Sequence, residues 1–262
     1  MFFLLIHLVL VLVALIGLNE LCRRLKILTV VVFFILPILL IPVWLNSGID
    51  SWFRWVKLFS VVFAVVWFTF FRFTKLGEKD FVKFIAAAIL CINILEAVVQ
   101  DLLKMQIPNT LNAAAGILSI VTLSGWRGIT TDQSCKEKDM VWPEMTMFWI
   151  VGYTVWNWVF VYFNFPENAA FHIMVLLACF IPALFKKSLW MQARAFTLAG
   201  WMIYFFTFPN FISSQVVWLP KNETLIWIAA IISLSINLIY SVLHFKKKFS
   251  RSITQPLDLT LQ

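Results

Sequence analysis

The amino-acid sequence predicts an all-α integral membrane protein of about nine transmembrane helices. Hydrophobic residues make up 62% of the 262 residues and charged residues only 13%, whereas soluble domains hold about 45–50% apolar and about 25% charged residues. Apolar runs long enough to cross a bilayer alternate with short polar breaks along the chain. Basic residues concentrate in every second break, which is typical of a protein that crosses a membrane repeatedly.

Nine apolar runs are the predicted spans. They lie at residues 2–18, 27–45, 56–74, 81–103, 109–125, 145–163, 167–185, 188–208 and 223–244. The first run has neither a basic segment before it nor a small-residue cleavage site, so we expect a retained helix rather than a signal peptide. Residues 1–245 would form one polytopic membrane domain, and residues 246–262 a short cytoplasmic tail that is basic and then polar.

The distribution of basic residues predicts the orientation in the membrane. Of the 21 Lys and Arg residues, 17 lie in the odd-numbered connections and the C-terminal tail, and 4 lie in the even-numbered connections. Because cytoplasmic loops carry the excess of Lys and Arg, we expect the N-terminus outside and the C-terminus in the cytoplasm. The net charge of +8 therefore reports topology, and no nucleic-acid partner is expected.

The fourth predicted span carries the main functional signal. At helical spacing Asn93, Glu96 and Gln100 share one narrow arc with Lys104. A charge near the middle of a membrane helix costs roughly 2.5–3.5 kcal/mol on insertion scales, so such residues face protein or water and commonly serve function. The alternative is that Glu96 is protonated or hydrogen-bonded to a neighbouring helix and only fixes packing.

Other polar residues in the spans complete the candidate site. Asn157 lies 13 residues past Glu144, just as Glu96 lies 13 past Lys83, so Asn157 and Glu96 should sit at similar depth. His172 follows an outer turn, and a lone histidine in an apolar helix is more often structural than a ligand. Arg194 can extend to the membrane surface. The candidate substrate- or ion-binding residues are Glu96, Asn93, Gln100, Asn157, Asn112, Asp101 and His172.

The sequence gives no signal for a metal or a cofactor. Its four cysteines, at positions 22, 91, 135 and 179, show no CxxC spacing and no pairing with histidines. The phosphate-binding, zinc-hydrolase and serine-hydrolase motifs are absent. The longest polar connection, residues 127–144, mixes both signs of charge and is predicted to be a solvated loop rather than a domain.

Three segments resemble a family of multi-spanning bacterial membrane proteins with no assigned activity. They are NILEAVVQD (residues 93–101), GYTVWNWVFVYFNFP (152–166) and WMQARAFTLAG (190–200). The resemblance would cover most of the chain and implies a place in the bacterial cytoplasmic (inner) membrane. It supplies neither a substrate nor a role for any residue.

Three functions are compatible with these patterns. The favoured hypothesis is a small secondary transporter or ion pathway for a cationic or proton-coupled solute, with Glu96 as the protonatable or cation-binding group. The second is an intramembrane enzyme acting on a lipid or lipid-linked substrate, with Glu96 or Asp101 as base and His172 as partner. The third is a non-catalytic subunit whose polar stripes dock another membrane protein.

Overall fold

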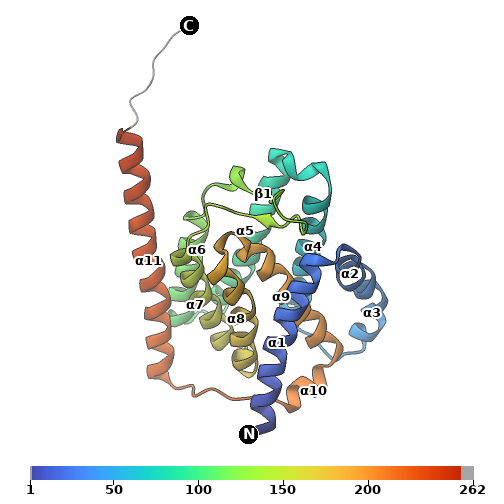
Figure 1. Cartoon of the computed structure of the whole chain (residues 1–262). Helices are drawn as coiled ribbons and strands as arrows, with labels where there is room; N and C mark the ends of the chain where they lie inside the picture. The colour runs from blue at the N-terminus through green and yellow to red at the C-terminus, as the bar shows by residue number, and fades with distance from the viewer. Residues whose placement is uncertain (1, 255–262) are drawn as a thin grey trace.

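The computed structural model describes residues 2–254, with side chains described for residues 2–250, as a bundle of helices standing side by side (Figure 1). Its elements, in chain order, are α1 (Phe2–Arg24), α2 (Lys26–Val30), η1 (Val31–Ile35), α3 (Leu36–Leu45), α4 (Trp52–Phe73), η2 (Lys75–Glu78), α5 (Asp80–Leu102), α6 (Ile107–Val121), η3 (Trp126–Gly128), β1 (Thr130–Thr131), β2 (Met140–Val141), α7 (Met147–Asn164), η4 (Pro166–Asn168), α8 (Ala169–Phe185), η5 (Lys187–Leu189), α9 (Trp190–Thr207), α10 (Pro209–Ser214) and α11 (Glu223–Thr254).

Six of the described helical segments are long and apolar enough to cross a membrane. They are Phe2–Arg24, Lys26–Leu45, Trp52–Phe73, Asp80–Leu102, Pro166–Phe185 and Glu223–Ser250. The prediction of an all-α fold is thereby confirmed, and these six helices have the length and composition that membrane spans require. Helices also occupy the other three predicted runs, but α6 is short at 15 residues, and α7 and α9 carry more polar side chains.

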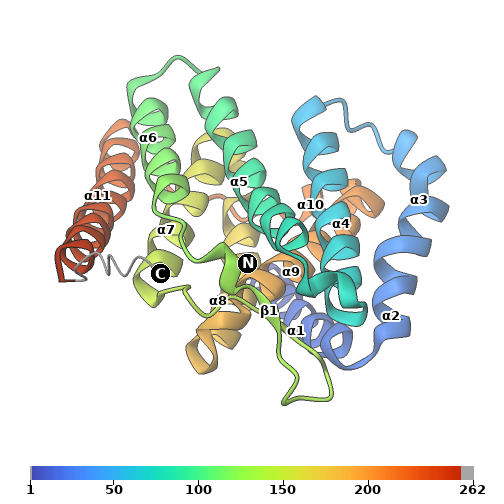
Figure 2. The same ribbon diagram turned by 90° about the horizontal axis from the view of Figure 1, so that it is seen from above.

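The polar helices α7 and α9 lie inside the bundle. Fifteen of the 18 residues of α9 and 11 of the 18 residues of α7 are buried. At the periphery, α11 lies at one edge and α2 with α3 at the opposite edge (Figures 1 and 2). Interior helices can carry polar groups because those groups meet protein partners instead of lipid.

The second apolar run is one helix with a widened turn. Pro37 has no N–H to donate to the carbonyl four residues earlier, and its ring crowds that turn. The chain responds with the π-helical segment η1, Val31–Ile35, immediately before α3. The helix continues through Pro42 and ends at Leu45, so the prolines distort this span without ending it.

Residues 127–144 cover one end of the bundle, which we call the hairpin face. Strands β1 and β2 pair antiparallel, with Thr130 opposite Val141. Ile129, Met140 and Trp142 are at most 1% exposed. The segment is therefore only in part the predicted solvated loop, because its apolar side chains pack on the helix ends while its tip is exposed.

The opposite end of the bundle is the N-terminal face, where α1 begins and α10 lies (Figure 1). At the other end of the chain, α11 runs without a break from Glu223 to Thr254. The basic part of the predicted tail, beginning at residue 246, thus continues a membrane helix. The polar end of that tail, residues 255–262, lies outside the described residues.

Candidate functional site

A cavity opens at the N-terminal face between α4, α5, α7, α8 and α9. The space between these helices is about 610 Å³ when the solvent-open mouth is counted. The mouth lies near Phe53 at the start of α4 and Phe165 just after α7, and the floor is formed by Arg194. Much of the wall is aromatic, from Phe53, Phe160, Phe165, Trp201 and Phe205.

The mouth carries an ion pair between α4 and η4. An Nη of Arg54 lies 2.5 Å from the Glu167 carboxylate. The same guanidinium lies over the rings of Phe165 and Phe205, at 5.3 and 5.1 Å from the ring centroids. Stacking and the ion pair together fix the orientation of Arg54 at the entrance.

One turn further into the bundle, Lys57 meets the stripe of α5. Its Nζ lies 2.6 Å from a Glu96 oxygen and donates to the backbone carbonyl of Asn93 at 3.1 Å. Ser60 donates to the same carboxylate at 3.3 Å. The Lys57 and Glu96 side chains are 11% and 13% exposed. Glu96 therefore faces α4, and its partners are Lys57 and Ser60 rather than Asn157.

Arg194 forms the floor of the cavity. Its Nη2 donates to Asn157 Oδ1 at 2.8 Å, and its Nε donates to the Tyr153 hydroxyl at 3.3 Å. The Nε2 of His172 lies 2.8 Å from the same Asn157 oxygen. Arg194 is 5% exposed, so the prediction that it extends to the membrane surface is wrong. Because α9 is buried among other helices, the Arg194 side chain has no lipid-facing surface along which to extend.

The guanidinium of Arg194 is incompletely satisfied. Its Nη1 is buried and has no hydrogen-bond partner among the described residues. No carboxylate of the described part of the chain lies within ion-pair distance of Arg194, whereas Arg54 and Lys57 each have one. The lining therefore holds three cationic side chains and two adjacent carboxylates, which leaves one positive charge uncompensated at the floor.

A second cavity of about 360 Å³ lies on the hairpin side of the first. Asn93, Arg194 and Leu198 line both cavities. The second cavity is otherwise lined by residues of α4, α5, α7 and α9, with Tyr153 on its wall. The two cavities are thus divided by a thin layer of side chains that includes the one uncompensated cation.

The remaining predicted site residues lie elsewhere. Asp101 is fully buried and accepts hydrogen bonds from the amides of Asn109, Asn112 and Asn164, at 2.8, 2.8 and 2.6 Å. Asn112 Oδ1 in turn accepts from Ser233 at 2.7 Å, which ties α11 to this cluster. The structure therefore joins α5, α6, α7 and α11 through Asp101, away from Glu96.

The members of the pair that an intramembrane enzyme would need each bond a different partner. His172 bonds Asn157, while Glu96 bonds Lys57 and Asp101 bonds three asparagine amides. Gln100 is half-buried on α5 and does not line the cavity. Among the described residues, no group of three or more His, Cys, Asp or Glu side chains could hold a metal ion.

A family model described as a family of unknown function, DUF5692, matches residues 1–258. The chain belongs to this family. The predicted resemblance to a family without an assigned activity is confirmed. Comparisons with curated proteins and with solved structures gave no match.

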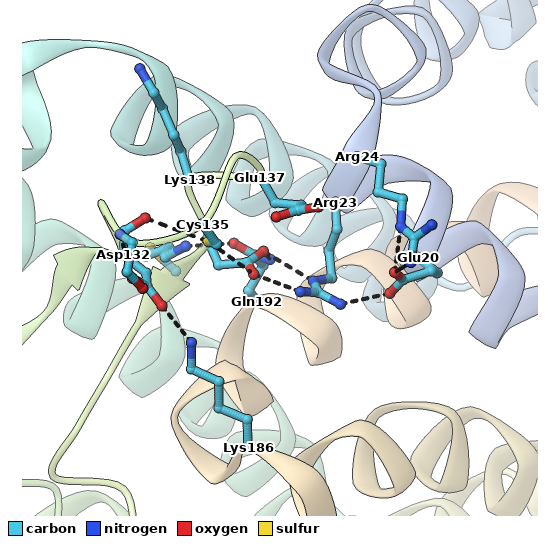
Figure 3. Close-up of polar contacts among 12 residues, drawn as sticks. Glu20, Arg23, Arg24, Asp132, Cys135, Glu137, Lys138, Lys186 and Gln192 are labelled. Carbon is cyan, nitrogen blue, oxygen red and sulfur yellow. Dashed lines mark hydrogen bonds and ion pairs between the residues drawn. The ribbon is translucent and has the colours of Figure 1, made fainter.

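In this DUF5692 chain the hairpin is anchored by Asp139. Its carboxylate accepts from Arg23 Nε and Nη2, at 3.0 and 2.7 Å, and from Gln192 Nε2 at 2.8 Å. Figure 3 labels Arg23 and Gln192 within this cluster of polar contacts. Arg72, fully buried, lies 4.0 Å away. Burial alone would raise the pKa of Asp139, but the hydrogen bonds from Arg23 and Gln192 and the charges of Arg23 and Arg72 outweigh it and hold this pKa below its ordinary value.

The sequence patterns did not predict the cationic residues of the site in this DUF5692 chain. Arg54 and Lys57 were counted only as topology signals, although they stand at i and i+3 among the aromatic residues of SWFRWVKLF. Arg194 lies four residues into a helix whose sequence, WMQARAFTLAG, is unusually polar. Polar composition inside an otherwise apolar bundle was the signal that could have found it.

Proposed function

We propose that this protein is a small secondary transporter that carries a small solute coupled to protons. The observation that carries the proposal is the pair of cavities divided by Asn93, Arg194 and Leu198. A site reached from one face and separated from a deeper cavity by few side chains suits alternating access, in which small movements expose the site to either side.

The Lys57–Glu96 pair supplies the proposed coupling element. Both side chains are largely buried, and Lys57 lines the cavity. Protonation of Glu96 would remove its attraction for Lys57 and free the ammonium group toward the cavity. A cationic solute is less favoured than the sequence suggests, because the charge of Glu96 is already offset by Lys57.

Solute-driven proton flux tests this function. Purified protein in liposomes that enclose a pH-sensitive dye is exposed to a panel of small carboxylic acids, amines and alcohols. At least one solute should change the internal pH in a protein-dependent way. Glu96→Gln should abolish that signal, while Glu78→Gln, at an exposed position, should keep it. Coupled flux that persists in Glu96→Gln would refute the role of Glu96, and no flux with any solute would refute transport.

We further propose nine crossings of a bacterial cytoplasmic membrane, with the N-terminus outside and the hairpin face and C-terminus in the cytoplasm. Basic residues at the ends of helices that point toward the hairpin support this orientation, since Arg24 ends α1 while Lys75 and Lys186 follow α4 and α8. Cys135 on the hairpin and Cys91 within α5 are half-buried, while Cys22 and Cys179 are fully buried, so Cys135 is the reporter in a Cys91→Ser background.

A membrane-impermeant maleimide tests the orientation. Cys135 should react only after cells are permeabilised, whereas Asn222→Cys, placed in the connection before α11, should react in intact cells. The opposite pattern would invert the topology. Reaction of both positions in intact cells would place them on one side and exclude an odd number of crossings between them.

A further inference from the structure

The floor of the cavity holds a buried cation without a counter-charge. Arg194 is 5% exposed, and its partners are the neutral side chains of Tyr153 and Asn157. A desolvated charge with no opposite charge is costly, and the cost falls when an anion is bound beside it. The unpartnered Nη1 gives such an anion a hydrogen-bond donor.

From this geometry we infer that the cavity binds a small carboxylate, with the acid group on Arg194 and an apolar or aromatic body against the ring-lined wall. The inference names the substrate class of the proposed transport site and rests on that proposal for its physiological role. Arg guanidinium suits planar carboxylates because its N–H groups form a fork that matches the two oxygens.

Charge balance favours a monoanion. Glu96 and Glu167 already offset Lys57 and Arg54, so one negative charge would leave the lining neutral. A phosphate dianion would exceed the one uncompensated positive charge and leave a buried negative charge. A cation would add a second positive charge beside Arg194 and should be excluded.

The walls select the body of the ligand. Five aromatic rings, those of Phe53, Phe160, Phe165, Trp201 and Phe205, line the cavity between the Arg54 mouth and the Arg194 floor. Such rings favour aromatic or branched aliphatic bodies by area burial and ring contacts.

Binding to the purified full-length protein in detergent tests this inference without requiring transport. The probes are benzoate, indole-3-acetate and octanoate, each compared with its matching alcohol and amine, and phenyl phosphate as the dianion. Calorimetry or equilibrium dialysis gives the dissociation constants. At least one carboxylate should bind tenfold or more tightly than its alcohol, its amine and the phosphate, as expected for a charge-assisted hydrogen bond.

Substitutions of Arg194 test whether the floor of the cavity determines carboxylate binding. Arg194→Gln should weaken carboxylate binding at least tenfold and reduce the preference over the alcohol, whereas Arg194→Lys should retain part of it. Arg127→Gln, at an exposed arginine of the hairpin segment, is the matched control and should leave binding unchanged. Size-exclusion profiles show whether each variant is folded.

The ligand series in the wild-type protein decides the question even where Arg194→Gln does not fold. If no carboxylate binds better than its alcohol and amine, the inference is overturned, as it is if a folded Arg194→Gln binds the acid unchanged. Carboxylate binding without solute-driven proton flux would support this site and refute the transporter. Flux driven by an amine alone would support the transporter and refute the carboxylate site.

Discussion

Replacing Asp139 by asparagine should release the hairpin from the bundle. Asp139 is 1% exposed and is the only carboxylate within 4.0 Å of Arg72 among the described residues. The Arg72 side chain is fully buried, and its other partners are four backbone carbonyls. The substitution keeps the shape of Asp139 but removes the counter-charge of Arg72 and one of the two carboxylates that contact Arg23, which keeps its ion pair with Glu20.

The free-energy cost of the Asp139→Asn substitution follows from the burial of the ion pair. Removing one partner of a buried ion pair costs about 3–5 kcal/mol, and the lower value applies because the Arg23 side chain is 22% exposed and partly screened by water. A cost of about 3 kcal/mol raises the population of the released hairpin on the order of 100-fold, since each 1.4 kcal/mol is a factor of ten.

Hydrogen exchange measures this population directly. The amide N–H of Met140 donates to Gln192 Oε1 at 2.7 Å, and that of Trp142 donates to the Ser188 carbonyl at 2.9 Å, so both are protected while the hairpin is docked. In Asp139→Asn their protection factors should fall on the order of 100-fold.

Asp132→Asn is the matched control on the same hairpin. Its partner Lys186 has a side chain that is 44% exposed, and surface ion pairs contribute about 0–1 kcal/mol. Protection should therefore fall no more than about fivefold in this variant. Equal losses in Asp132→Asn and Asp139→Asn would refute the assignment of Asp139 as the buried anchor.

Three further results are expected. Because the folded-state pKa of Asp139 lies below its ordinary 3.8, its stabilisation is complete above that pH and fades as the pH falls through the lowered value; protection of Met140 should persist at about pH 5, and loss already there would contradict it. Gly152→Ala would place a Cβ 2.9 Å from Asn237 Oδ1, while Gly17→Ala meets nothing within 4 Å; only Gly152→Ala should lower the melting temperature, reflecting a loss of about 1–3 kcal/mol. Asp101→Asn presents an amide group to three amide donors and should cost about 1–3 kcal/mol by chemical denaturation, and a loss no larger than that of the exposed Glu78→Gln would count against the cluster.

The sequence by itself determined the class of the protein and the place of its helices. Apolar runs of bilayer length are recognisable in the sequence because the few charged residues lie mostly between them. A helix occupies each of the nine runs. The cost of a charge in lipid also pointed to Glu96 as a residue that needs a partner. These are local properties, set by composition over about 20 residues.

Only the tertiary structure decided which polar groups meet. Glu96 pairs with Lys57 on the preceding helix, and Asn157 accepts a hydrogen bond from Arg194 and contacts His172. Asp101 accepts hydrogen bonds from three asparagine amides and does not line the cavity. Helical periodicity fixes which residues share a face but carries no information on which neighbour that face meets.

Arg194 shows the physical reason most clearly. Near the end of a lipid-facing helix its side chain would reach the membrane surface, whereas α9 lies at the centre of the bundle with 15 of 18 residues buried. Burial is a property of the whole packing arrangement. The same side chain thus becomes the uncompensated floor of a cavity, and this placement is the ground on which we propose a carboxylate as the ligand.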